Sequence, residues 1–301
     1  MQIILTGSLG HISKPLATLL LAEGHSVAII SSSPAKKNDI VALGAKPLIG
    51  KLEDKGFLTQ AFVGADVVYT MMPLNAHTGA YLDQALDVDA KHLEIAHSYA
   101  EAIYNSGVRK VIHLSTIGAH TGEGVGLLNP HFEVEAILRK LPESVHIKMM
   151  RPVGFYYNML AFIPVIKATG AIIQNYGGNE KEPWVSPMDI AEVIVEEIEQ
   201  PFEGRTVSYI ASDEISPREA AKVLGHAIGM PDLQWMAIPD AAFLDELVKA
   251  GINPQVAKGI TEMNASRVNG ILYEDYYKHR PTLGKVKLTD FAKEFATVFN
   301  Q

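Results

Sequence analysis

The sequence predicts an α/β fold, a doubly wound parallel sheet with a smaller C-terminal α+β lobe. In the first half of the chain, short β-branched runs alternate with helical patterns, as βαβ units require. The strand-like runs are continuously apolar, which is typical of strands covered by helices on both faces. Glycine follows the predicted helices at positions where a left-handed residue commonly ends a helix, namely Gly24, Gly44, Gly64 and Gly107.

The predicted elements follow one another in a regular order. Strands are predicted over residues 3–6, 27–31, 47–49, 67–71, 111–115 and 145–150, and helices over 12–23, 35–43, 55–62, within 81–106 and over 132–141. Beyond these the rhythm loosens, with short strands over 171–174, 184–185 and 206–210 and helices over 188–199, 217–228, 241–249 and 254–264. We therefore expect a first domain over 1–152 and a smaller lobe over 153–301, interleaved with the last strands of the sheet.

Composition excludes several classes of function. The 301 residues are 48% hydrophobic and 20% charged, which suits a globular protein with a sizeable core. The formal net charge of −8, without a basic block, argues against a nucleic-acid surface. The absence of cysteine excludes disulfides, thiolate catalysis and cysteine-ligated zinc. Because the start lacks a basic leader and the longest apolar run, 159–166, is too short to span a bilayer, we predict a soluble, cytoplasmic protein without a membrane partner.

A glycine-containing turn joins the first predicted strand to the first predicted helix. It consists of Gly7, Ser8, Leu9, Gly10, His11 and Ile12. Glycine permits an unusual φ and close approach to phosphate oxygens, and the helix N-terminus offers N–H groups and its dipole to a pyrophosphate. The spacing also fits an ordinary tight turn, and Ser13 stands where a third glycine is usual. Its place at the first strand–helix junction favours a dinucleotide site, so we assign residues 1–152 as the dinucleotide-binding domain.

The end of the second predicted strand favours NADP(H) over NAD(H). An NAD-selective site usually carries an acid here for the ribose diol, but the first acid is Asp39. Hydroxyl and ammonium groups suited to a 2′-phosphate stand there instead, on Ser31, Ser32, Ser33, Lys36 and Lys37. A polar loop with an N-capping serine explains the same residues, and both interpretations can hold together.

The ends of later strands predict the rest of the site, because ligands of doubly wound sheets bind beyond the carboxyl ends of strands. After the fourth predicted strand, Met71, Met72 and Pro73 should flank the cofactor, the methionines giving an adaptable apolar wall. The loop after the strand ending at Met150 should lie over the nicotinamide. Its aromatic and amide side chains are candidate substrate contacts, or else they begin a buried helix: Tyr156, Tyr157 and Asn158.

Motifs spread over most of the chain resemble one protein family. They are Thr6-Gly7-x-x-Gly10, Gly50-x-Leu52-x-Asp54, residues 61–66, His113-Leu114-Ser115-Thr116, residues 131–135, residues 151–158, Asp189-Ile190-Ala191 and residues 202–206. In order and spacing they resemble the NmrA-like branch of the atypical short-chain dehydrogenase/reductase superfamily, close to its NADPH-dependent quinone reductases. The resemblance implies a Rossmann-like fold, and cofactor contacts from Ser115 and Thr116. It also implies a carboxamide-binding turn at Pro152, Val153, Gly154 and Phe155. Lys51 departs from the family, which has an acid there.

The usual catalytic pair of short-chain dehydrogenases is missing. They use Tyr-x-x-x-Lys, in which lysine lowers the pKa of the tyrosine, and none of the 11 tyrosines has lysine four residues later. Alignment with the family puts Leu127 in the place of the tyrosine and His131 in that of the lysine. We therefore take His131 as the candidate catalytic residue, which contacts the nicotinamide ribose or donates a proton. The alternative is a helix-start histidine paired with Glu135.

The sequence leaves two functions open. Hydride transfer needs no side-chain nucleophile, so the first is an NADPH-dependent oxidoreductase that reduces a quinone or another small apolar or aromatic acceptor. The second is a non-catalytic NAD(P)-binding redox sensor acting on a protein partner, which Leu127 favours. A sugar epimerase is disfavoured, because its chemistry needs the missing tyrosine. We predict no metal, since the acids and histidines between residues 87 and 97 fit a solvated helix face better. A homodimer stays open.

Overall fold

A computed structural model describes residues 1–73 and 79–301. At its centre lies a seven-stranded sheet in the order β10-β6-β5-β4-β1-β2-β3, in which every pair of neighbours is parallel. The strands are β1 (Gln2–Leu5), β2 (Ser26–Ser31), β3 (Lys46–Ile49), β4 (Val67–Met71), β5 (Lys110–Leu114), β6 (His146–Pro152) and β10 (Arg205–Ile210). The predicted doubly wound parallel sheet is confirmed. The strand order reverses between β1 and β4, so the crevice at their carboxyl ends is the expected ligand position.

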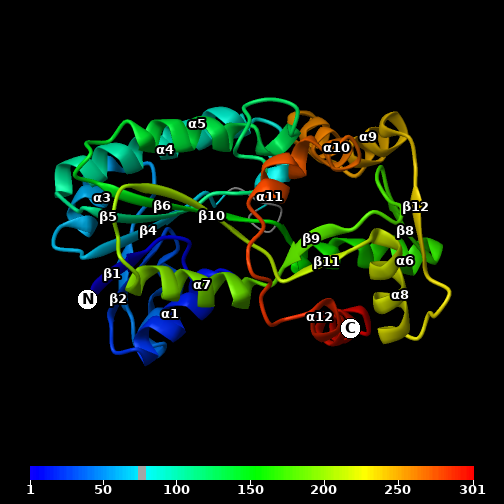
Figure 1. The fold of residues 1–301 in the computed structure, drawn as a ribbon, viewed down its shortest axis with the longest axis horizontal. Coiled ribbons are helices and arrows are strands. Elements are labelled where there is room, and N and C mark those ends of the chain that lie inside the picture. The colour runs from blue at the N-terminus through cyan, green and yellow to red at the C-terminus, as the bar shows by residue number, and fades with distance from the viewer. Residues whose placement is uncertain (74–78) are drawn as a thin grey trace.

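Helices cover both faces of this sheet, as Figure 1 shows. One face carries α1 (Ser13–Ala22), α2 (Lys37–Ala42) and α7 (Pro187–Glu199), whose apolar residues form one core with the sheet. The other carries α3 (Lys55–Phe62), α4 (Val88–Ser106) and α5 (Pro130–Arg139), which form a second core. Within α1 the buried residues Leu16, Ala17 and Leu20 recur at helical spacing, which explains why this segment packs as a helix against the sheet.

The remaining elements form smaller sheets and a helical layer at the other end of the molecule (Figure 1). A three-stranded sheet has the order β11-β9-β7, and a two-stranded sheet pairs β12 with β8. These strands are β7 (Gly154–Phe155), β8 (Ala171–Gln174), β9 (Glu182–Val185), β11 (Asp213–Ile215) and β12 (Gln234–Ala237). The helices are α6 (Ile163–Thr169), α8 (Pro217–Ala227), α9 (Asp240–Lys249), α10 (Pro254–Val268), α11 (Glu274–Lys278) and α12 (Leu288–Phe299). Because α7 and β10 return to the main sheet between these elements, the chain passes repeatedly between the two regions.

The C-terminal region has its own apolar core. Trp184 of β9 and Phe295 of α12 are each at most 1% exposed and belong to it, together with Leu224 of α8. Among the described residues, no helix combines the length and the apolar character that crossing a membrane requires.

Candidate functional site

The turn between β1 and α1 is tight, and two of its residues are glycines without side chains. Gly7 has φ +91° and Ser8 has φ +54°, so two consecutive residues are left-handed. A Cβ atom on Gly7 would lie 2.5 Å from Ser13 Oγ and 3.2 Å from Met71 Sδ, and therefore only glycine fits. Gly10 closes the turn by donating its N–H to the Gly7 carbonyl at 3.2 Å. The turn thus exposes backbone at the carboxyl end of β1.

The helix that follows begins without a side-chain cap among the residues that the structure describes. Its first turn contains no acid, and Ser13 Oγ donates to the Thr6 carbonyl at 2.9 Å instead of capping the helix. Lys14 donates its N–H to the Gly10 carbonyl at 3.1 Å and Pro15 has no N–H, so it is mainly the helix dipole, without an acid in the first turn, that favours an anion at this end.

The end of β2 meets this turn through Ser31. Ser8 donates its hydroxyl to Ser31 Oγ at 2.9 Å and its N–H to the Ile30 carbonyl at 3.0 Å. The other predicted residues of this segment are exposed on the surface, namely Ser32, Ser33, Lys36 and Lys37. Lys36 Nζ lies 3.4 Å from Asp39 Oδ2, an exposed ion pair that contributes little to stability. The two lysines therefore remain free to approach an anion near the end of β2.

The end of β4 is fixed from both sides. Met71 donates its N–H to Thr6 Oγ1 at 3.1 Å, and its carbonyl accepts the hydroxyl of Tyr99 at 2.8 Å. Its side chain lies against Gly7, whereas Met72 is only 8% exposed and packs in the core beneath α3 and α4. Pro73, half-buried, directly precedes the undescribed residues. Tyr99 was not predicted, because nothing in its neighbourhood on α4 marks a contact with β4.

The loop after β6 reaches the glycine turn through a stack of rings. His11 stacks on Tyr157 with ring centroids 4.5 Å apart, and Tyr157 stacks on Phe155 at 5.1 Å. The turn from Pro152 to Phe155 is held by Ile117, which donates its N–H to the Pro152 carbonyl, and by Val153, which donates to the Ile210 carbonyl. The predicted first and last parts of the site therefore lie together.

Tyr156 does not belong to this group, contrary to its prediction as a substrate contact. It is 1% exposed, stacks on Phe291 of α12 at 5.6 Å, and donates its hydroxyl to the Val286 carbonyl at 3.4 Å. Since Tyr156 and Tyr157 point to different surroundings, Tyr156 is a core residue of the C-terminal region. Asn158 is exposed.

Ser115 is committed to a buried ion-pair network. Its hydroxyl donates to Glu135 Oε1 at 2.7 Å, and Arg151 binds the same carboxylate with two hydrogen bonds of 2.9 and 2.8 Å. Burial raises the pKa of Glu135, but Arg151 outweighs this effect and holds the pKa below its ordinary value. Arg151 also donates to Tyr209 and Asp275. The Ser115 hydroxyl therefore donates its proton within this network, and Thr116 beside it is half-buried.

His131 lies in a group of histidines from three elements. Its ring meets that of His92 on α4 edge to face at 5.1 Å, and its buried Nδ1 has no hydrogen-bond partner in the described ranges 1–73 and 79–301. Burial, with His92 and His113 nearby, lowers the pKa of His131 well below its ordinary value. His113 on β5 lies within hydrogen-bond distance of Thr70, with Nδ1 2.9 Å from Oγ1. The imidazole of His131 is therefore neutral near pH 7.

Two expectations about these histidines are corrected. His92 does not lie on a solvated helix face: it is 3% exposed and donates Nδ1–H to the Val88 carbonyl at 2.7 Å. The alternative pairing of His131 with Glu135 also fails, since that carboxylate binds Ser115, Arg151 and Arg139.

The position of the missing tyrosine is closed by α10. A Cβ atom on Gly259 would lie 3.2 Å from Leu127 Cβ and 3.1 Å from its backbone nitrogen. A Cβ atom on Gly126 would in turn overlap the Gly259 carbonyl. Glycine on both sides lets the two backbones touch, so Leu127 packs against α10.

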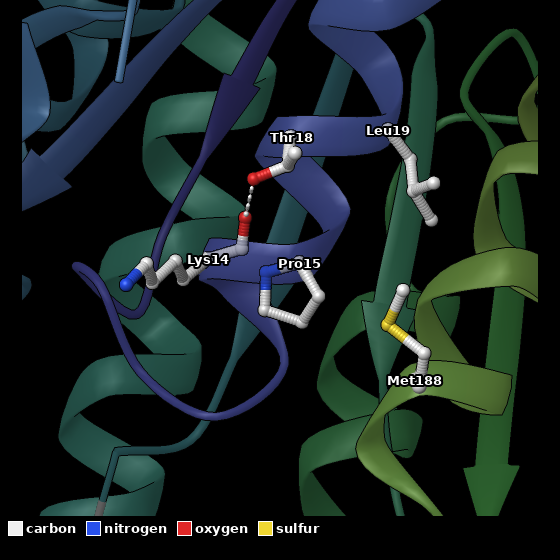
Figure 2. A pocket seen from close by; sticks show the side chains of 5 residues that line it. All are labelled: Lys14, Pro15, Thr18, Leu19 and Met188. Atoms are coloured by element: carbon white, nitrogen blue, oxygen red, sulfur yellow. Dashed lines mark hydrogen bonds between the residues drawn. The ribbon is translucent and has the colours of Figure 1, made fainter. Parts of the chain in front are cut away.

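A groove of about 250 Å³ lies between α1 and α7 (Figure 2). It is lined by Lys14, Pro15, Thr18, Leu19 and Met188. None of the predicted site residues lines it, so the groove is separate from the turn at Gly7.

Some motif residues have structural roles. Asp54 caps α3 by accepting the Phe57 N–H at 2.9 Å, and the ring of Phe57 lies 2.6 Å from where a Cβ on Gly50 would stand. Asp66 accepts the Gln2 N–H at 2.6 Å. Asp54 and Asp66 thus hold the start of α3 and the start of β1.

Comparisons with known proteins agree with this architecture. A nucleoside-diphosphate-sugar epimerase from Staphylococcus aureus superposes with a TM-score of 0.77 at 16% identity, covering 97% of this chain and all 100% of that one. A NADPH-dependent quinone oxidoreductase from Escherichia coli, solved with NADPH, gives 0.77 at 19% identity over 97% of this chain and 99% of that one. Equal scores for different activities show the fold alone.

In sequence, a segment of 118 residues is 25% identical to a ketoreductase of a farnesylated dihydroquinoline oxide from Stigmatella aurantiaca. The segment is 38% of this chain and spans only about a third (34%) of that relative. Residues 1–275, by contrast, match the NmrA-like family as a whole. The chain therefore belongs to the NmrA-like family.

Proposed function

We propose that this protein is an NADPH-dependent reductase that transfers a hydride to a small apolar or aromatic acceptor such as a quinone. The proposal is based on one observation: His11 of the turn that begins at Gly7 stacks on Tyr157, which in turn stacks on Phe155. Both the turn and the ring stack lie beyond the carboxyl ends of strands, where doubly wound sheets bind their ligands. The similarly folded Escherichia coli oxidoreductase, which was solved with NADPH, supports the choice of cofactor.

The residues around the turn fit a dinucleotide. Gly7 permits the tight left-handed turn at the end of β1, and the start of α1, without an acid in its first turn, would direct a favourable dipole at a pyrophosphate. Lys36 and Lys37, with the hydroxyls of residues 31–33, would hold the 2′-phosphate of NADPH. The turn over residues 152–155 would hold the carboxamide.

The ring stack orients the acceptor. When bound, NADPH supplies a hydride from its dihydronicotinamide ring. Phe155, an outer ring of the stack, and the edge of the half-buried Tyr157 would offer apolar surface against which an aromatic acceptor packs. Burial, with Tyr81 nearby, raises the pKa of Tyr157, so its phenol stays protonated and neutral beside the acceptor.

The proton that completes the reduction comes from water. A quinone that accepts a hydride needs a further proton to become a hydroquinone. Burial lowers the pKa of His131, so its imidazole is neutral and does not act as an acid. A ring nitrogen of His131 would instead contact the ribose. Leu127, which stands in the place of the usual tyrosine, carries no proton to give.

Steady-state oxidation of NADPH with a panel of quinones tests this function. We expect NADPH oxidation above the buffer rate with at least one quinone. If no quinone is reduced above the buffer rate, the proposed function is wrong. The double variant Lys36→Ala/Lys37→Ala should weaken NADPH more than NADH, by about tenfold if one charge-assisted contact is lost. An equal loss for both cofactors would place the 2′-phosphate elsewhere.

The second candidate, a redox sensor that binds dinucleotide without turnover, is favoured by Leu127 and its contact with α10. It predicts NADPH binding without oxidation by any acceptor, and a protein partner retained in only one cofactor state. Retention of the same partner with NADPH and with NADP⁺ would contradict it.

A further inference from the structure

A buried polar cluster stands behind the proposed carboxamide turn. Arg267 of α10 donates to Glu182 Oε2 at 2.8 Å and to the hydroxyl oxygen of Tyr273 at 2.9 Å, and Tyr273 donates to the same carboxylate oxygen at 2.7 Å. The side chains of Arg267 and Glu182 are only 11% and 6% exposed. Such a pair is costly to bury, so its retention calls for a role beyond stability.

Arg267 of this cluster packs over the ring of Trp184 on β9. The guanidinium carbon of Arg267 lies 5.4 Å from the ring centroid of Trp184 and 4.7 Å from that of Tyr176. Trp184 is 1% exposed. A cation held between rings away from water fixes the orientation of both rings.

Trp184 lies directly against the turn. In the parallel pairing of β7 with β9, Gly154 is opposite Trp184 and Phe155 is opposite Val185. A Cβ atom on Gly154 would lie 3.3 Å from the six-membered edge of the Trp184 ring. The indole therefore backs the strand that continues into the ring stack of Phe155 and Tyr157.

The same helix reaches the other side of the site. Gly259, on α10 with Arg267, packs against Leu127. Ahead of the helix, Asn253 donates to the carbonyls of Asp83 and Leu86 at 2.8 and 3.1 Å. One rigid helix thus contacts both the segment with the absent tyrosine and, through Arg267 and Trp184, the carboxamide turn.

We propose that Arg267 is a positioning residue, which through Trp184 fixes the turn at Gly154 and thereby the nicotinamide half of the cofactor. The proposal rests on the proposed function, because it takes this turn as the nicotinamide site. Arg267 touches neither cofactor nor substrate. Its loss should loosen the nicotinamide end while leaving the adenosine end, near Gly7 and Ser31, intact.

The test compares two ligands in a background with one tryptophan. The chain has 2 tryptophans, so Trp235→Phe leaves Trp184 as the only tryptophan. Excitation selective for tryptophan then makes Trp184 the donor of energy to bound NADPH. 2′,5′-ADP carries the adenosine half without nicotinamide, and calorimetry measures its affinity. In Arg267→Met, energy transfer to NADPH should fall and NADPH affinity should drop about tenfold, while 2′,5′-ADP affinity stays within about twofold.

Two further variants keep the result interpretable. Arg267→Met/Glu182→Gln removes both buried charges and should show the same split between ligands even if the single variant folds poorly. Arg280→Met is the matched control: Arg280 lies over Tyr277 at 4.8 Å and pairs with Glu214, but its side chain is 57% exposed and it does not contact Trp184. It should leave both ligands and the energy transfer unchanged.

Equal weakening of both ligands, or no change for either, would overturn the positioning role. Absence of NADPH binding by the unsubstituted protein would instead overturn the proposed function, and the positioning role with it.

Discussion

Acidification should destabilise the folded protein through three neighbouring histidines, namely His92 on α4, His113 on β5 and His131 on α5. His113 is fully buried, and desolvation lowers its pKa from 6.5 to about 4, against a smaller opposing effect of Glu135. Between these two pH values the unfolded chain binds the proton and the folded chain does not. The stabilisation is therefore complete above pH 6.5 and is lost as the pH falls toward about 4.

The magnitude follows from the shift. At about pH 5 the unfolded histidine is almost fully protonated and the folded one almost fully neutral, which costs about 2 kcal/mol of unfolding free energy for His113 alone. The pKa values of His92 and His131 are lowered in the same direction by burial, so the whole group loses more.

Urea denaturation at a series of pH values measures this loss. His113→Asn keeps a polar group toward Thr70 but removes the titrating ring. It should be less stable than the unsubstituted protein at neutral pH, because it leaves a cavity. Between about pH 7 and about pH 5, the unfolding free energy of this variant should fall by about 2 kcal/mol less than that of the unsubstituted protein. His97→Asn, at an exposed position of α4, is the control. Parallel pH dependences for His113→Asn and the unsubstituted protein would refute the reasoning.

Two substitutions test the buried network and the corrected tyrosine. Arg151→Met leaves Glu135 buried without its main partner and should lower the unfolding free energy by about 3–5 kcal/mol in urea titrations. Arg139→Met removes a second arginine from the same carboxylate, but its side chain is 39% exposed, so the loss should be under about 1 kcal/mol. Similar losses for both variants would contradict the network. Tyr156→Phe removes only a long hydrogen bond within the core and should leave the KM for the acceptor unchanged. Tyr157→Ala removes the middle of the ring stack and should raise this KM. A raised KM for Tyr156→Phe would show that Tyr156 belongs to the site.

Most of the main sheet could be predicted, because strands such as β1, β2 and β4 are almost continuously apolar, whereas the edge strand β10 alternates polar and apolar residues. The short strands β7 and β11 were missed, since two or three residues carry no periodicity. They exist because β9 lies between them and pairs with both. The amphipathic helix α12 was also missed, and it is the partner that buries Tyr156 through Phe291. Neighbouring tyrosines look alike in sequence until the distant element that covers one of them is known.

The candidate site shows the same division. The turn at Gly7 was predictable, because a backbone conformation that requires glycine is visible in the sequence as a glycine at that position. The group of His92, His113 and His131 was not, because α4, β5 and α5 come together only in the folded sheet. Ser115 matched a family motif, yet its hydroxyl is held by Glu135, whose own partner Arg151 lies on the next strand.

Binding of NADPH to Gly7→Ala tests the central claim most directly. A Cβ at this position meets Ser13 Oγ at 2.5 Å and requires an alanine at φ +91°. Gly64→Ala is the matched control, since Gly64 has φ +76° and open space around its Cβ position, at the end of α3. Calorimetric titration should show NADPH binding to the unsubstituted protein and to Gly64→Ala, and a loss of about tenfold or more in Gly7→Ala. Equal affinity in all three proteins, or binding by none, would contradict the assignment of this turn as the dinucleotide site.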